Sequence, residues 1–268
     1  MPLCEEHHQR SHGERVADVR PRRRILAGPA SVSPQARRKG MMSAMARNSE
    51  AYRTLRTVTH PELVAFCAAC AERGSGIHRL LGEPEEAALF EEALSLGWNA
   101  ARGEVDDEAV VDLVEEAEEL LGCEDDEDDE DDTESRGFHA TQSLMLAVNT
   151  LSVYLNPAPE RAEMSGQTME TLLSGFDFTL GGERAVITRA GESSPVGDLQ
   201  RLEQEAQTRF LASYIDGTGS LLRGTTPEEM RHSCLAARER IAHAVETLAE
   251  LRGWEIRGTG AAPGRPRP

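Results

Sequence analysis

Aromatic side chains are scarce in this sequence, at 4% of its 268 residues. A core with so few of them must be built mainly from Leu, Ala, Val and Met, which suits helices, whereas a β-sandwich needs more β-branched and aromatic residues. Long apolar runs are also absent, so we expect neither a membrane-spanning helix nor a signal peptide. These absences favour a helical protein that works in the cytoplasm without contact with a membrane.

Recognisable catalytic motifs are missing as well. The sequence contains no P-loop, no dinucleotide-binding fingerprint and no G-x-S-x-G turn. Its five cysteines are an odd number in a chain too long to need a disulfide framework, which fits a reducing compartment. We therefore predict no catalytic residues and no cofactor, and the sequence leaves open whether any reaction is catalysed.

Acidic side chains are abundant and unevenly distributed. The chain has a formal net charge of −18, although residues 1–48 carry ten basic and only four acidic side chains. Residues 49–253 carry 16 basic and 42 acidic side chains, a net charge of −26. Such a region repels nucleic-acid phosphates and attracts basic proteins or divalent cations, while a high net charge also keeps a protein in solution.

The N-terminal part differs in composition from the rest. Residues 1–48 are rich in Arg, Ser, Pro and Gly and have no helical or strand period, so they are predicted to be a disordered basic tail. This tail could touch nucleic acid. It could equally be an over-extended start of translation, because Met41, Met42 and Met45 directly precede the first credible folded segment.

Residues 49–258 are predicted to form one helical domain, followed by a short disordered tail at 259–268. Within the domain, the run EDDEDDEDD lies in a predicted disordered loop at 124–134, since so many like charges cannot pack. The run lacks the glycine and the terminal glutamate of a calcium-binding loop. It could also occupy a basic cleft of a partner, and a solvated insertion is the simpler interpretation.

Seven segments show apolar residues at three- and four-residue steps, the period of a helix with one buried face. They are 59–74, 84–103, 107–121, 138–155, 159–180, 198–215 and 227–253. The segment 138–155 is apolar most of the way round and is predicted to be the central helix. The sequence thus predicts an all-α fold, a single bundle of about seven helices, with AVIT at 185–188 in a loop.

Local signals mark several helix ends. Thr59 with Glu62, and Thr226 with Glu229, have the spacing of capping boxes that open helices. Gly74 is interpreted as the stop of the first segment. In the segment 107–121 the apolar residues are all predicted to point inward, Val111 and Leu120 included.

The first helical segment reads FCAACAER and, with the overall plan, resembles the YjaG-like family, small all-helical bacterial proteins of unknown function. The matching residues are Phe66, Ala68, Glu72 and Arg73. Further similarity comes from the segment from Pro195 to Phe210 and from three positions of the central helix, Phe138, Ala140 and Ala147. The chain departs from the family in its basic N-terminal extension, its acidic run at 124–132 and an extra stretch around Gly217–Thr226. The resemblance implies a helical fold and supplies no catalytic residues.

Cys67 and Cys70 form the most conspicuous motif, a CxxC pair. A redox pair normally lies at a helix N-terminus, where the first thiol has a lowered pKa. Here the pair lies two turns inside a helix, on the face of Leu63 and Phe66, which favours buried structural thiols. A zinc site would need two more ligands, and Cys123 and Cys234 lack paired spacing.

Histidine offers a second candidate, His139, at the start of the central helix. Histidines in a bundle can bind a metal, but the strong signal, Glu-x-x-His pairs on two helices, is absent. We therefore predict no metal site, and name His139, Cys67 and Cys70 as the candidates if a metal is found. A lone histidine at a helix start is more often a packed or surface residue.

The function favoured by these features is binding of a protein partner with a basic surface, as an adaptor, a regulator or an immunity-type neutraliser. The acidic charge of 49–253 would steer the partner, and a smaller apolar patch would supply affinity. The alternative is a metal- or thiol-dependent enzyme that uses His139, Cys67 and Cys70. Nucleic acid is an improbable partner except through the tail at 1–48, and the sequence does not predict the oligomeric state.

Overall fold

A computed structural model describes residues 48–122, 134–183, 195–212 and 226–257. Contacts divide the chain into Met1–Ser43 and Ala44–Pro268, and all the described residues belong to the second unit. The tails predicted at 1–48 and 259–268, the acidic loop and the 185–188 segment therefore lie outside the described residues, apart from Asn48 and Glu134.

Every one of the seven predicted segments is helical as far as the structure describes it, which confirms the all-α class, and no strand occurs in the described residues. The elements are α2 (Ser49–Leu55), α3 (His60–Leu81), the 3₁₀ helix η1 (Pro84–Glu86), α4 (Ala87–Arg102), α5 (Asp107–Gly122), α6 (Arg136–Leu155), α7 (Pro159–Leu180), α8 (Asp198–Phe210), α10 (Pro227–Ser233) and α11 (Leu235–Arg252). None of these helices combines the length and the apolar composition needed to cross a lipid bilayer.

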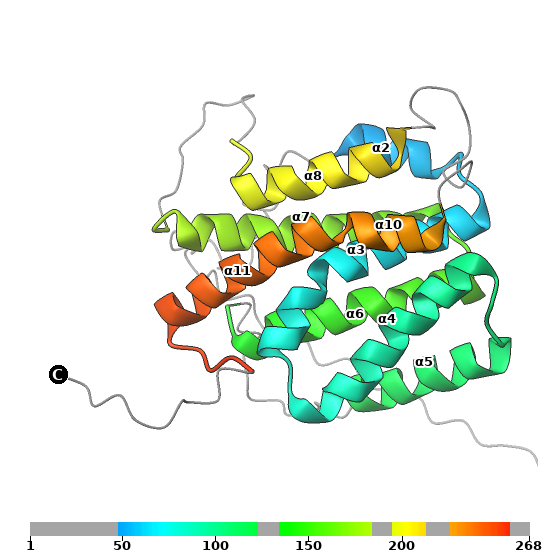
Figure 1. Cartoon of the computed structure of the whole chain (residues 1–268), viewed down its shortest axis with the longest axis horizontal. Helices are drawn as coiled ribbons and strands as arrows, with labels where there is room; N and C mark the ends of the chain where they lie inside the picture. Colours follow the sequence, from blue (N-terminus) through cyan, green and yellow to red (C-terminus); the bar gives the residue numbers. More distant parts are fainter. Residues whose placement is uncertain (1–47, 123–133, 184–194, 213–225, 258–268) are drawn as a thin grey trace, which may run out of the picture. The chain divides into compact units, whose positions relative to one another are not determined.

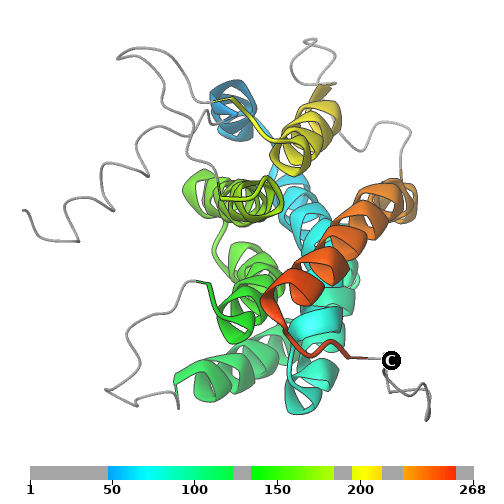
Figure 2. The same cartoon turned by 90° about the vertical axis from the view of Figure 1, so that its left-hand side faces the viewer.

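Helix α3 occupies the centre of the packing. It contacts α4, α6, α7, α10 and α11, and Figure 2 shows it between α6 and α11. Nearly all of its side chains are buried, whereas α6, predicted to be the central helix, leaves Met145 47% and Leu155 40% exposed. The prediction of α6 as the central helix was wrong on this point. The sequence of α3 is less apolar than that of α6, because the residues that α3 buries include charged side chains and glycines.

Gly74 does not end the first helix, as predicted, but lies in the middle of α3. A Cβ atom at Gly74 would lie 2.8 Å from the Sδ atom of Met169 on α7, and one at Gly76 would lie 2.9 Å from the Cβ atom of Ala242 on α11. Both glycines therefore allow close approach of neighbouring helices. The helix continues because these contacts offset the low helix propensity of glycine.

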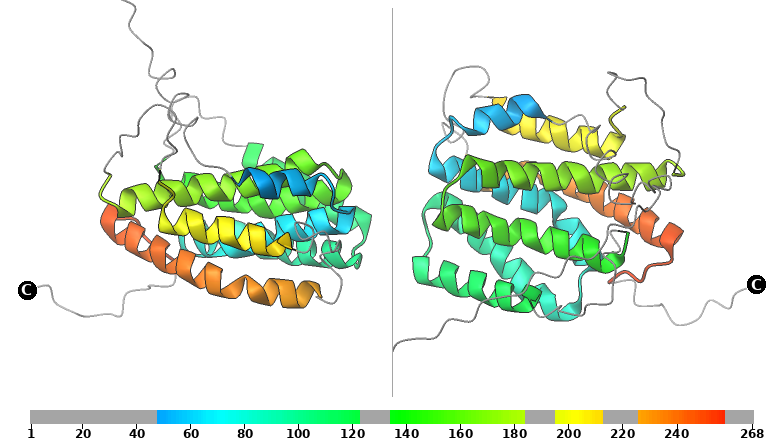
Figure 3. Two further views of the ribbon diagram at one scale, coloured as in Figure 1. Left: turned by 90° about the horizontal axis from the view of Figure 1, so that it is seen from above. Right: turned by 180° about the vertical axis from the view of Figure 1, so that it is seen from behind.

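The helices α8, α7, α6 and α5 pack side by side in this order, as seen from behind in Figure 3, with α3 against α6 and α7. Helix α5 lies at one end of the row and contacts only α6 and α4 extensively (Figure 1). Its buried face is accordingly narrow and consists of Val110, Leu113 and Ala117. Val111 and Leu120, predicted to point inward, are 39% and 37% exposed.

Both predicted capping boxes are present. The Glu62 carboxylate accepts from the backbone N–H of Thr59 at 2.8 Å, and that of Glu229 accepts from the N–H of Thr226 at 2.8 Å. The predicted last helix is divided, however, because the N–H of Cys234 bonds to the carbonyl of Arg231, three residues back. This tighter turn separates α10 from α11.

Candidate functional site

Two neighbouring residues of α3, Glu72 and Arg73, are charged and buried, with exposed fractions of 0% and 2%. Helix α3 is packed on several sides, so side chains at successive positions both enter the interior, toward different neighbours. Buried charges are stable only when paired and hydrogen-bonded. The partners of these two residues therefore define the polar centre of the protein.

Arg73 pairs with Glu203 of α8 through a two-point contact. Its Nε lies 2.7 Å from Oε2 of Glu203, and its second terminal nitrogen lies 2.5 Å from Oε1. The amide of Gln207 donates to the same carboxylate at 3.1 Å and to the carbonyl of Gly166 at 3.2 Å. Burial alone would lower the pKa of the Arg73 guanidinium, but Glu203 and the neighbouring Cys70 and Cys234 together outweigh it, so the pKa is raised.

Thiols surround this pair. A terminal nitrogen of Arg73 lies 3.4 Å from Sγ of Cys70, and the other lies 3.9 Å from Sγ of Cys234. Burial raises the pKa of both thiols, and it raises the pKa of Cys67 to about 12. The predicted burial of Cys67 and Cys70 is confirmed, and at neutral pH both are thiols rather than nucleophilic thiolates.

Glu72 has a different set of partners, on α4, α10 and α11. Its Oε2 accepts from the indole N–H of Trp98 at 3.2 Å and from Nε of Arg231 at 2.9 Å, and its Oε1 accepts from Arg238 at 2.8 Å. One carboxylate thus binds two guanidinium groups. The three donors hold together four helices around a single buried charge.

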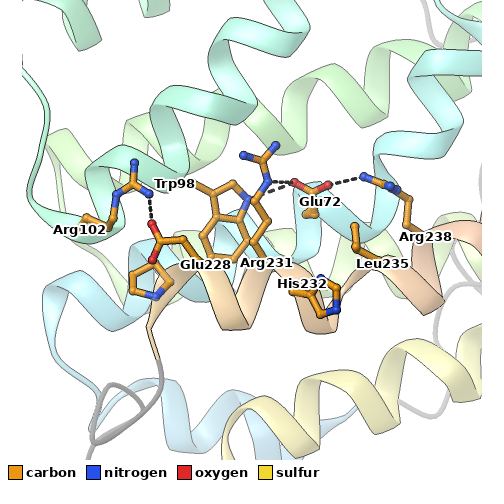
Figure 4. A pocket seen from close by; sticks show the side chains of 9 residues that line it. Glu72, Trp98, Arg102, Glu228, Arg231, His232, Leu235 and Arg238 are labelled. Atoms are coloured by element: carbon orange, nitrogen blue, oxygen red, sulfur yellow. Dashed lines mark hydrogen bonds and ion pairs between the residues drawn. The ribbon is translucent and has the colours of Figure 1, made fainter.

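A cavity of about 250 Å³ opens above Glu72, and Figure 4 shows its side chains from close by. Trp98 and Leu235 contribute apolar surface, while Arg231 and Arg238 reach in from α10 and α11. Arg102 lies at the far end, where it pairs with Glu228.

Another buried carboxylate, that of Glu170 on α7, has neutral hydrogen-bond partners among the described residues. The hydroxyl of Tyr52 and the amide of Gln204 donate to it, the latter at 2.7 Å, and the backbone N–H of Asn48 lies 3.4 Å away. Burial, followed by the nearby Glu170, raises the pKa of Tyr52, so the phenol keeps its proton and remains a donor. This cluster fastens α2 and α8 to α7.

On α5 the acidic side chains point to solvent. Asp112, Glu115, Glu116 and Glu118 are exposed and lie opposite the buried stripe of the helix. In the part of the chain that the structure describes, none of these four has an ion-pair partner. We call these four residues the acidic face of α5; Val111 lies within it and Leu120 at its edge.

His139 is buried to 9% exposure, in a setting unlike that of the cysteines. Its ring centroid lies 5.0 Å from that of Phe176 and 5.5 Å from that of Trp254. These aromatic neighbours form a packed cluster, whereas Cys70 lies beside Arg73. The contacts thus do not unite His139 with Cys67 and Cys70, and within the described ranges no three His, Cys, Asp or Glu residues are arranged to hold a metal ion.

Sequence reasoning missed Trp98, Glu203, Gln207, Arg231 and Arg238. Helix α8 reads as an amphipathic surface helix, yet its Gln200, Glu203 and Gln207 are buried. Glu72 and Arg73, and the segment that contains Glu203, had been singled out only as positions of the expected family resemblance.

Comparison with known proteins adds no relative. The chain matches no protein-family model, and no curated protein and no solved structure matches it.

Proposed function

We propose that this protein acts by binding a protein partner with a basic surface, and that the acidic face of α5 makes the contact. The observation that carries the proposal is that Asp112, Glu115, Glu116 and Glu118 are exposed on one helix side, with no ion-pair partner among the described residues. Unpaired surface carboxylates raise the association rate of basic partners. Val111 and Leu120 supply the apolar contact that affinity requires.

The proposal includes action in the cytoplasm, as an adaptor, a regulator or an immunity-type neutraliser, and kinship with the YjaG-like family. Support for the kinship is that two of the matching residues, Glu72 and Arg73, are themselves buried and pair with oppositely charged residues of other helices. The alternative, a metal- or thiol-dependent enzyme using His139, Cys67 and Cys70, gains no support from their contacts. Nucleic acid remains an improbable partner, because phosphates and the acidic face repel each other.

The test compares two full-length variants with equal charge. The first neutralises the acidic face through Asp112→Asn, Glu115→Gln, Glu116→Gln and Glu118→Gln. The second neutralises four exposed acids of other helices, namely Glu92, Glu205, Glu239 and Glu250, each replaced by Gln. Partners are captured from a native extract at low and at high salt, identified by mass spectrometry and then purified for a direct binding measurement.

The expected result is a basic partner whose association rate falls at high salt and falls about tenfold or more in the α5 variant, with little change in the matched control. If the association rate fell equally in both variants, the effect would come from the overall net charge and not from the acidic face of α5. A purified partner that binds both variants and the native protein alike, at every salt concentration, would contradict the proposal.

A further inference from the structure

The cavity above Glu72 has a lining of unusual charge. Three arginines face it, Arg102, Arg231 and Arg238, against two glutamates, Glu72 and Glu228. At the Glu72 end of the cavity, Arg231 and Arg238 share one carboxylate, which leaves one surplus positive charge there, within a region whose net charge is −26. In a region with 16 basic and 42 acidic side chains, the convergence of three arginines on one hollow is the feature that needs an explanation.

The arginines retain donors that the protein does not use. Arg231 and Arg238 each donate one hydrogen bond to the carboxylate of Glu72. The structure gives their remaining guanidinium nitrogens no hydrogen-bond acceptor among the described residues, and Figure 4 shows the terminal nitrogens of Arg231 directed away from Glu72. Arg102, in contrast, is fully engaged with Glu228, Glu104 and Asn99. Planar guanidinium groups with free N–H pairs match carboxylate oxygens in geometry and charge.

The remaining walls are apolar. The indole of Trp98 and the side chains of Leu235 and Pro227 line the cavity. A volume of about 250 Å³ is smaller than the pockets that hold drug-sized ligands, so it fits a compact molecule. One surplus charge is neutralised by a monoanion, whereas a phosphate dianion would need two.

From these features we infer that the cavity is a binding site for a small organic monocarboxylate with an apolar or aromatic body. The carboxylate is held by the free donors of Arg231 and Arg238, and the body lies against Trp98 and Leu235. Glu72 fixes the two arginines in place from below. This site is separate from the acidic face of α5 and would exist whether or not that face binds a partner.

The test uses benzoate as the probe and the full-length protein carrying Trp254→Phe, so that Trp98 is the only tryptophan. Saturable change of its fluorescence is the readout, checked by calorimetry. Arg231→Gln and Leu235→Phe should each weaken benzoate binding about tenfold or more, the first by removing charged donors and the second by filling the cavity without adding a second tryptophan. Arg240→Gln, which removes an exposed arginine of α11 outside the cavity, is the matched control and should leave binding unchanged.

Leu235→Phe leaves both ion pairs of Glu72 intact, so it separates loss of the site from loss of folding, which circular dichroism verifies for each variant. Benzamidine, the cationic analogue of benzoate, should not bind, and phenyl phosphate should bind more weakly. The inference is overturned if folded protein gives no saturable response to benzoate, if Arg240→Gln weakens binding as much as Arg231→Gln does, or if phenyl phosphate binds more tightly.

Discussion

Helices α3 and α5 carry ionisable side chains under opposite conditions. In α3, Glu72 and Arg73 are enclosed and each is bonded to an opposite charge from a distant part of the chain. In α5, Glu115 and Glu118 face water and have no such partner among the described residues. The same residue types therefore hold the interior together in one helix and remain available for outside contacts in the other, because desolvation makes pairing obligatory only in the interior.

Breaking the buried pair should have the largest effect. Arg73→Met leaves the Glu203 carboxylate buried without its cation, and we expect a loss of about 3–5 kcal/mol in the free energy of unfolding. The measurement is urea denaturation followed by circular dichroism. Arg79→Gln on the same helix is the control, since its pair with Glu91 is 34% and 50% exposed and should be worth about 0–1 kcal/mol. Equal losses in the two variants would contradict the contrast between buried and exposed charge.

The next largest effect is expected in the reactivity of the thiols of α3. In a chain with Cys4→Ser and Cys123→Ser, the raised pKa of Cys67 lowers its thiolate fraction roughly thousandfold relative to an unfolded thiol. Reaction with a thiol reagent at neutral pH should therefore be slow in native protein and fast in urea. Fast reaction of Cys67 and Cys70 in the native protein would contradict this expectation and would favour the alternative of a thiol-dependent enzyme.

Replacing glycine by alanine should change the free energy of unfolding in opposite directions in α3 and in α5. Gly76→Ala places a methyl group 2.9 Å from the Cβ atom of Ala242, so we expect it to cost about 1–3 kcal/mol. Gly122→Ala at the end of α5 meets no atom of the described residues within 4 Å and should stabilise the protein by about 0.4–1 kcal/mol, because alanine restricts the unfolded chain more than glycine does. Thermal unfolding of both variants measures the difference, and the same sign in both would refute the role of Gly76 as a packing contact.

A smaller effect concerns His78, stacked on Phe90 with its Nε2 3.2 Å from Glu86. Burial lowers the pKa of His78 below 6.5, and this outweighs the opposing influence of Glu86. The imidazole of His78 binds a proton more readily in the unfolded chain than in the folded protein. Above about pH 6.5 His78 is neutral in both states and costs no stability, and the free energy of unfolding should fall as the pH drops from there toward the folded pKa. Denaturation measured across this pH range should show that the free energy of unfolding falls less steeply in His78→Gln than in the native protein. If the two curves of stability against pH were parallel, His78 would not be neutral and buried in the folded protein.

The smallest effect is expected on α5. Asp112 and Glu116 are four residues apart, and like charges at this spacing destabilise a helix by roughly 0.2–0.5 kcal/mol. Glu116→Gln should therefore raise stability by about that amount at low salt, and the gain should vanish at high salt because of screening. A gain that persists at high salt would point to an origin other than charge repulsion.

The helices themselves could be predicted from the sequence, because helical period and capping boxes are local. Thr59 with Glu62 and Thr226 with Glu229 mark helix starts without reference to the rest of the fold. The continuation of α3 through Gly74 could not be predicted, since its cause is Met169 on another helix. Periodicity alone also overstated the buried width of α5, because the number of neighbours of a helix is a tertiary property.

The polar centre was less predictable than the helices. The pairing of Arg73 with Glu203 joins positions 130 residues apart, and nothing in either segment identifies the partner. Trp98 and Arg231 meet at Glu72 for the same reason, through packing of α4 and α10 on α3. The acidic net charge, in contrast, could be counted from the sequence, and the structure adds that four of the exposed acids lie together on one side of α5.

The separation of Arg73 from Glu203 has a consequence for biosynthesis. A ribosome adds about 5–20 residues per second, so the carboxylate is made roughly 7–26 s after the guanidinium. During that interval the middle of α3 cannot be sealed from water, because its cation would lose hydration without compensation. The nascent polypeptide must therefore keep its apolar surfaces accessible until α8 has left the exit tunnel, and this waiting period is when a chaperone would be needed most.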